Sequence, residues 1–345
     1  MQGIVDSVDL SPMQEAADAM GGGFSVRKTI LALASGEMRL SEETLYEVLY
    51  GMRDEVIARL GGVFAAFLMP LIVAAVIRQG AGDHARVAVF LCAMVCAIAF
   101  TSIMTASIDV ARTLLTRISA LTSAALPALA ALSALAGATS SAALITPMTS
   151  LAGKLIVDVL GGWGIWLTSA ACALACAAAF AGALKLDGIF GLIKSLVMWG
   201  SGVLLALFVG LLTVQGMLGA SYDSAAVHTA RFAVDNMIPV IGGDLADSLD
   251  AALSSILLVK SASGVTGMLI LVSACASPIA ELTATMLAIR LANAVAMPVS
   301  DPGMTAIVAR FADVVLMLIT ICLVAVMLAL VMTGAAINAG RGVLR

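Results

Sequence analysis

Three aspartates near the middle of the chain are spaced so that they could bind a partner. Asp244, Asp247 and Asp250 follow the Gly242-Gly243 pair at helical spacing, so their carboxylates lie toward one side of a helix near its N-terminus. The helix dipole favours negative charge at that end. This side of the helix is either an ordinary solvated face or a contact for a basic partner.

A further carboxylate that could take part in chemistry is that of Glu281, which lies three residues after Pro278 in an apolar run. A carboxylate at membrane depth costs about 2.5 kcal/mol or more unless it finds water or a partner. Two interpretations stay open. Glu281 lines an aqueous path or bonds a neighbouring subunit, or it pairs inside the bundle with Arg290 or with the backbone that Pro278 frees.

No catalytic pattern accompanies these carboxylates. Ile241-Gly-Gly-Asp244 lacks the first glycine of the G-x-G-D pattern of intramembrane aspartyl proteases. Trp199-Gly-Ser-Gly202 likewise lacks the first glycine of the G-x-S-G pattern of rhomboid proteases. The zinc pattern H-E-x-x-H and the nucleotide-binding P-loop do not occur in the sequence. We therefore expect no enzyme, no catalytic residues and no cofactor, and any ATP used on its behalf would be hydrolysed by another chain.

The cysteines favour packing over metal binding. All six lie inside apolar runs, and two pairs have i,i+4 spacing, but no histidine or carboxylate accompanies them as metal ligands usually require. A free cysteine behaves as a small hydrophobic residue. The sequence therefore predicts no metal site at Cys92, Cys96, Cys172, Cys176, Cys275 and Cys322.

Composition decides which kind of element positions these residues. The chain is 61% hydrophobic and 12% charged, whereas soluble domains are about 25% charged. It is therefore predicted to be a polytopic membrane protein, and it has no basic region suited to nucleic acid. A spanning helix needs ~20 mostly apolar residues. The runs that fit are 60–77, 87–108, 161–184, 196–218 and 314–337, with a sixth at 264–289.

Prolines complicate the count of spans. The apolar stretch 119–152 contains Pro127 and Pro147, so a re-entrant hairpin fits it as well as a straight span. Pro278 and Pro298 have the same separation, which suggests a repeated unit. We expect an all-α, polytopic integral membrane bundle of about 6–7 spans, with one or two Pro-broken re-entrant or interfacial hairpins and an N-terminal amphipathic helical segment.

Two regions outside the spans are amphipathic. Residues 1–59 carry twice as many acidic as basic side chains and place apolar residues on one helical face after Ser41, which predicts an extracytoplasmic or interfacial helical region. Its first part, residues 1–23, has no basic n-region and no apolar h-region, so it is not a secretory signal as written. Residues 60–345 form the expected membrane domain, with an amphipathic extramembrane insert at 219–263 whose helix is entered at Pro239 and left at Lys260.

Short loops with basic residues predict the orientation in the membrane. Arg78 and Arg86 flank one loop, and Lys185 and Lys194 flank another, so both loops are expected on the cytoplasmic side. The acidic N-terminal region and the 219–263 insert would then lie on the opposite side. The C-terminal arginines favour one extra crossing.

Several segments resemble one family. Thr229-Ala-Arg-Phe, Asn236-Met-Ile-Pro-Val-Ile-Gly-Gly, Asp247-Ser, Leu-Leu-Val-Lys260 and the Pro-rich stretch from Ser123 to Met148 are similar to stage III sporulation protein AE of endospore-forming bacteria. Together they cover about the middle half of the chain. No catalytic motif belongs to this resemblance, so it implies a role and a location rather than a reaction.

The resemblance implies a multi-pass protein of the mother-cell-derived outer forespore membrane. Its expected partners are the lipid bilayer, other stage III sporulation membrane proteins, ring-forming proteins and a secretion-type ATPase, in a channel or secretion-like complex needed for forespore development. Self-association of the chain is also open. We expect this chain to be the multi-span platform of that complex. The candidate partner-docking or path-lining residues are Arg231, Asn236, Pro239, Gly242, Gly243, Asp244, Asp247, Asp250 and Glu281.

The alternative is a secondary transporter or permease that acts alone. It would need an ion site with several convergent polar side chains. The predicted spans supply few of these beyond Thr101, Ser102, Thr105 and Glu281.

Overall fold

The computed structural model describes residues 10–19, 25–35, 42–80, 85–180, 187–237, 242–300 and 302–339. These residues are helical apart from short turns, and none of them forms a strand. The elements are α2 (Ser11–Ala19), α3 (Val26–Ala34), α4 (Glu42–Gly80), α5 (Ala85–Leu135), α6 (Thr139–Lys154), η2 (Leu155–Gly164), α7 (Ile165–Phe180), α8 (Asp187–Met237), α9 (Gly242–Ala296) and α10 (Pro302–Asn338).

Six stretches of the described helices are long and apolar enough to cross a membrane. They are Val56–Ile77, Val89–Leu135, Leu151–Ala178, Asp187–Met217, Leu253–Ala296 and Pro302–Asn338. Each contains or overlaps one of the six apolar runs predicted from the sequence. The predicted all-α polytopic membrane bundle is therefore confirmed.

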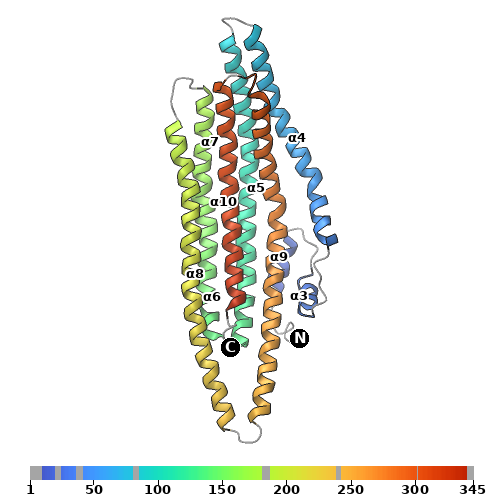
Figure 1. Cartoon of the computed structure of the whole chain (residues 1–345), viewed down its shortest axis with the longest axis vertical. Helices are drawn as coiled ribbons and strands as arrows, with labels where there is room; N and C mark the ends of the chain where they lie inside the picture. The colour runs from blue at the N-terminus through green and yellow to red at the C-terminus, as the bar shows by residue number, and fades with distance from the viewer. Residues whose placement is uncertain are drawn as a thin grey trace.

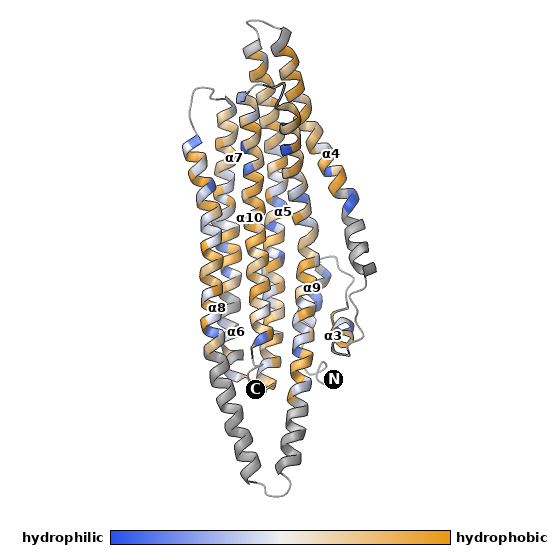
Figure 2. Ribbon diagram, in the orientation of Figure 1, coloured by the Kyte–Doolittle hydropathy of each residue, from blue (hydrophilic) through white to orange (hydrophobic). Residues whose placement is uncertain are grey.

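The helices form one elongated bundle (Figure 1). α6, η2 and α7 follow one another without a break as a single rod, and the long helices that are joined by turns run antiparallel. α10 packs against α5, α7, α8 and α9, and α4 packs against α5 and α9. Hydrophobic residues dominate along most of the bundle (Figure 2). The core lies around α10, because twenty of its side chains are buried.

An aromatic cluster sets the register of three helices. The rings of Phe100 on α5 and Phe311 on α10 stack with their centroids 4.0 Å apart. Phe67 on α4 lies 6.5 Å from the first ring and 6.1 Å from the second. All three side chains are fully buried. Aromatic pairs at these separations attract each other beyond their hydrophobic burial, so they fix α4, α5 and α10 against one another.

The short N-terminal helices pack on the bundle. α2 contacts α5, and α3 contacts α9. Met13, Val26 and Ile30 are buried there, and the Val26 backbone N–H donates to the Gln14 side chain at 2.8 Å. The predicted boundary between an N-terminal region (1–59) and a membrane domain (60–345) falls inside α4, which continues across it. This division of the chain stays a prediction.

The prolines lie inside continuous helices rather than at breaks. Pro127 is within α5 and Pro147 within α6, and the chain reverses between them at Gly137, whose φ of 81° suits glycine. The stretch 119–152 is thus a hairpin with a tight turn between α5 and α6, and whether it is re-entrant stays a prediction. Neighbouring helices can compensate for the hydrogen bond that a proline removes.

The second Pro pair behaves differently. Pro278 lies inside α9, and the chain reverses only at residues 297–300, next to Pro298. If the two Pro pairs marked a repeated unit, the residue that corresponds to Gly137 in the second unit should also lie at a turn. That residue lies inside α9. The predicted repeat is therefore not supported by the positions of the turns.

α8 and α9 extend beyond the membrane-spanning part of the bundle. The apolar run predicted for α8 ends at residue 218, but the helix continues to Met237, and α9 begins at Gly242 with a sequence that carries Asp244, Asp247 and Asp250. We call residues 218–237 and 242–252 the arm. At 1.5 Å per residue the α8 portion is about 30 Å long, and Figure 1 shows both helices reaching past the others. The predicted helix end at Lys260 is wrong, because α9 continues to Ala296.

The two ends of the bundle differ in which helices they join. The end of α4, the start of α5, the end of α7 and the start of α8 lie together, and the arm lies at the opposite end (Figure 1). This agrees with the prediction that the two basic loops share a side. α10 ends on the arm side, so the described residues contain no seventh crossing. Which side faces the cytoplasm stays a prediction.

Candidate functional site

Glu281 on α9 forms an ion pair with Arg59 on α4. The Arg59 guanidinium lies 2.5 Å from the Glu281 carboxylate, and both side chains are 28% exposed. The predicted pairing with Arg290 is wrong. Nine residues along a helix are two and a half turns, so Arg290 lies on the opposite side of α9, where its guanidinium is 3.7 Å from Asp313.

Glu281 also borders a polar cavity of about 510 Å³ between α5 and α9. Proline has no N–H, so Pro278 leaves the carbonyl of Ala274 without its helical donor beside this cavity. Carboxylates, a guanidinium, hydroxyls and this carbonyl therefore converge on one space. The lining residues are Asp109, Val110, Thr113, Leu114, Arg117, Ser273, Ala274, Ser277, Pro278 and Glu281.

The contribution of α5 was not predicted. Residues 109–118 lie between two apolar runs and carry three charges, so they read as a connection between spans. In the structure α5 is one helix of 51 residues. The signal that could have revealed it is the absence of glycine and proline around Asp109, Arg112 and Arg117, since a connection usually contains such residues.

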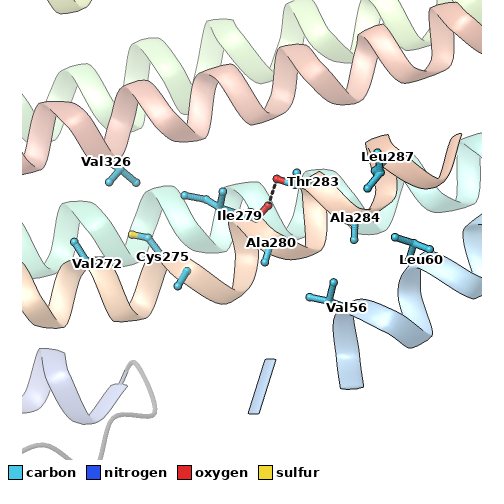
Figure 3. A pocket seen from close by; sticks show the side chains of 11 residues that line it. Val56, Leu60, Val272, Cys275, Ile279, Ala280, Thr283, Ala284, Leu287 and Val326 are labelled. Carbon is cyan, nitrogen blue, oxygen red and sulfur yellow. Dashed lines mark hydrogen bonds between the residues drawn. The ribbon is translucent and has the colours of Figure 1, made fainter. Parts of the chain in front are cut away.

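The opposite side of α9 borders an apolar cavity of about 500 Å³ (Figure 3). Val56 and Leu60 reach it from α4 and Val326 from α10. The Thr283 hydroxyl donates to the Ile279 carbonyl at 2.6 Å, so it offers little polarity to the space. The two cavities thus lie on opposite sides of α9, the polar one toward α5 and the apolar one between α9, α4 and α10.

Ion pairs join α8, α9 and α10 near the basic-loop end. The Lys194 ammonium lies 2.8 Å from the Asp313 carboxylate. Asp313 also faces Arg290, and Arg310 pairs with Asp187. These ion pairs connect α8, α9 and α10.

A buried lysine ties the ends of α9 and α10 on the arm side. The Lys260 side chain is fully buried, and its ammonium donates to the Ala339 carbonyl just after α10. A cation at a helix C-terminus is favoured by the helix dipole. Nearby, Gly264 of α9 lies against Ile337 of α10, where a Cβ would be 2.5 Å from the isoleucine Cδ1. Lys260 and Gly264 therefore define a close helix contact.

The cysteines lie in the helix packing. Cys92, Cys96, Cys275 and Cys322 are buried, and Cys172 and Cys176 are half-buried, all as free thiols. Within the described ranges, no three histidine, cysteine, aspartate or glutamate side chains gather as a metal site would need.

The remaining predicted residues lie on the arm. Arg231 and Asn236 belong to α8, and Gly242, Gly243, Asp244, Asp247 and Asp250 belong to α9. Pro239 lies outside the described residues. Asp250 and Glu281 are 31 residues apart on one helix, or about 45 Å. The structure thus separates the predicted set into an arm and a cavity at membrane depth.

Comparison with known proteins gives one family. Residues 24–340 match the model of the family described as stage III sporulation protein AE. The stage III sporulation protein AE of Bacillus subtilis (strain 168) is 31% identical over 114 residues, which are 33% of this chain and 29% of that protein. The match therefore spans less than a third of the Bacillus protein. No solved structure matches the chain.

Proposed function

Because the chain belongs to the stage III sporulation protein AE family, we propose that it is a non-enzymatic, multi-span subunit of the stage III sporulation channel or secretion-like complex. In this proposal it lies in the mother-cell-derived outer forespore membrane and supports forespore development. Its six spanning helices form a platform. Other stage III membrane proteins, ring-forming proteins and a secretion-type ATPase assemble on that platform.

The observation that carries the platform role is the arm. α8 and α9 have 51 and 55 residues, and at the arm they reach past the other helices (Figure 1). The arm carries Asp244, Asp247 and Asp250 near the start of α9. A helical pair that projects from the membrane is suited to contact a partner outside it.

Shortening the arm tests the docking role. Residues 222–249 would be replaced by a short Gly-Ser linker, which leaves the spanning stretches, Lys260 and the α9–α10 contact in place. We expect the shortened chain to insert and melt like the full chain but to lose at least one of its complex partners in co-purification from sporulating cells. Retention of every partner would refute the docking role.

A matched variant separates charge from length. Asp244, Asp247 and Asp250 changed together to Asn keep the arm but remove its negative charge. If a basic partner binds there, its recovery should fall and should fall further with added salt, since exposed charges are screened. Unchanged recovery would assign the three carboxylates to a solvated face.

The second candidate function is a transporter acting alone, which the polar cavity beside Glu281 favours. Reconstituted alone in vesicles, such a protein would move solute, and Glu281→Gln would lower the flux. Flux without partners would support this candidate against the platform.

A further inference from the structure

α5 carries a polar face through the middle of its spanning stretch. Its members are exposed, and their spacings along the helix place them on one side of it. From first to last they cover about 31 Å, close to the ~30 Å hydrocarbon thickness of a bilayer. We call this set the α5 polar face: Ser102, Thr105, Asp109, Arg112, Thr113, Thr116 and Ser123.

This face has the wrong composition for contact with lipid. Along residues 99–134, all of them described, no large hydrophobic side chain is exposed. α8 shows what a lipid-facing helix of this bundle looks like. Its Trp199 is 75% exposed and its Leu207 68%, and other large apolar side chains line the same helix. Lipid can cover α8. On α5 the hydroxyls of Thr105, Thr116 and Ser123 donate to carbonyls of their own helix, so the groups that lipid cannot solvate are the charges of Asp109 and Arg112.

Three charged residues lie on or beside this face. Asp109, Arg112 and Arg117 form no ion pair with any residue in the described part of the chain, whereas Lys194, Arg290 and Asp313 at the basic-loop end are paired. Unpaired charges within a spanning segment mark contact with water or with other polar groups. Both signs are present, so the face selects neither anions nor cations.

The polar cavity opens beside the same face. Asp109 and Thr113 line it from α5, and Ser277 and Glu281 line it from α9. Its 510 Å³ is room for on the order of ten water molecules. Water there would reach the carbonyl that Pro278 leaves unpaired and the outer side of the Arg59–Glu281 ion pair. The face and the cavity share Asp109 and Thr113 and therefore form one continuous polar surface.

We propose that the α5 polar face is one wall of a water-filled passage across the membrane, open to small hydrophilic solutes of either charge. The proposal rests on the proposed function and adds to it, since a platform for partner proteins does not need a passage for solutes. It does not depend on the arm. The shortened arm can fail to bind partners while the passage is found, and the reverse is equally possible.

Cysteine accessibility tests the passage. Thr105→Cys, Thr113→Cys and Ser123→Cys sample three depths of the face, and Leu207→Cys samples the lipid-facing side of α8. Each full-length variant, in membrane vesicles, is treated with a cationic and with an anionic methanethiosulfonate that do not cross bilayers. The unaltered chain, whose six cysteines are buried or half-buried, sets the background.

We expect the three α5 cysteines to react with both reagents roughly tenfold faster than Leu207→Cys, because the thiolate that reacts forms in water and not in hydrocarbon. Rates no faster than that of Leu207→Cys would overturn the proposal and assign the face to a dry protein interface. Reaction at one end only, or with only one reagent, would also overturn it, since the surface would then be a dead-end vestibule or a charge-selective site.

A charge change gives an independent measurement. Asp109→Lys combined with Thr105→Cys should raise the ratio of anionic to cationic labelling severalfold, because the new ammonium lies one turn from the thiol. Asp54→Lys, at an exposed position on α4, is the control and should leave the ratio unchanged. An unchanged ratio with Asp109→Lys would show that the two side chains do not share an aqueous space.

Discussion

Gly264 allows a close approach of α9 to α10 that no larger residue permits. A Cβ built there lies 2.5 Å from Cδ1 of Ile337 and closer still to its Cγ1. Carbon atoms prefer 3.5–4.0 Å, so Gly264→Ala requires the helices to separate by roughly 1 Å or the isoleucine to leave its rotamer. Overpacking of this kind costs about 1–3 kcal/mol.

The expected net effect is a loss of stability. We take ~3 kcal/mol for the overpacking because two atoms clash, and alanine regains ~1 kcal/mol over glycine in helix propensity. Gly264→Ala should therefore destabilise the bundle by about 2 kcal/mol. In detergent, its melting temperature should fall by several degrees, measured as the fraction that remains monodisperse on size exclusion after heating.

Two controls make the explanation specific to this contact. Gly267→Ala would place its Cβ 3.8 Å from the nearest atom, an ordinary contact, so it should be neutral or slightly stabilising. Ile337→Ala removes both clashing atoms, and in that background Gly264→Ala should cost nothing further. If Gly264→Ala melts like the unaltered chain, or if the cost persists with Ile337→Ala, the close helix contact is refuted.

Three further changes probe the packing with the same melting assay. Lys260→Met removes the charged group that donates to the Ala339 carbonyl. The last turn of α10 should therefore loosen, and amide hydrogen exchange in that turn should accelerate. Arg59→Ala leaves the carboxylate of Glu281 without its partner and should destabilise the bundle by about 1 kcal/mol. Adding Glu281→Gln should recover part of that loss, and no recovery would count against the ion pair. Phe311→Ala removes the centre of the aromatic cluster and should cost about 3–5 kcal/mol, whereas Leu207→Ala on the lipid-facing side should cost much less.

The sequence alone predicted the six spans because a membrane-spanning helix is defined by local composition. The runs 196–218 and 314–337 lie inside α8 and α10, where apolar residues continue for the full width of a bilayer. The same locality explains the error at α5. Charges at Asp109, Arg112 and Arg117 interrupt the hydrophobic pattern, although the helix itself continues through them.

The candidate site could be predicted only in part. Glu281 was found because a carboxylate in an apolar run is costly wherever the chain folds. Its partner could not be found, since Arg59 meets it only through the packing of α4 on α9. The cavity depends on the register of α5 against α9, which no local pattern contains. The polar face of α5 was visible in the sequence only through Thr101, Ser102 and Thr105.

The length of α9 has a mechanical consequence. Its 55 residues form one strut of about 80 Å that begins in the arm and passes Pro278 beside both cavities. A helix resists compression along its axis and bends most easily where a proline has removed a hydrogen bond. A force applied to the arm would therefore bend α9 at Pro278, within its apolar spanning stretch.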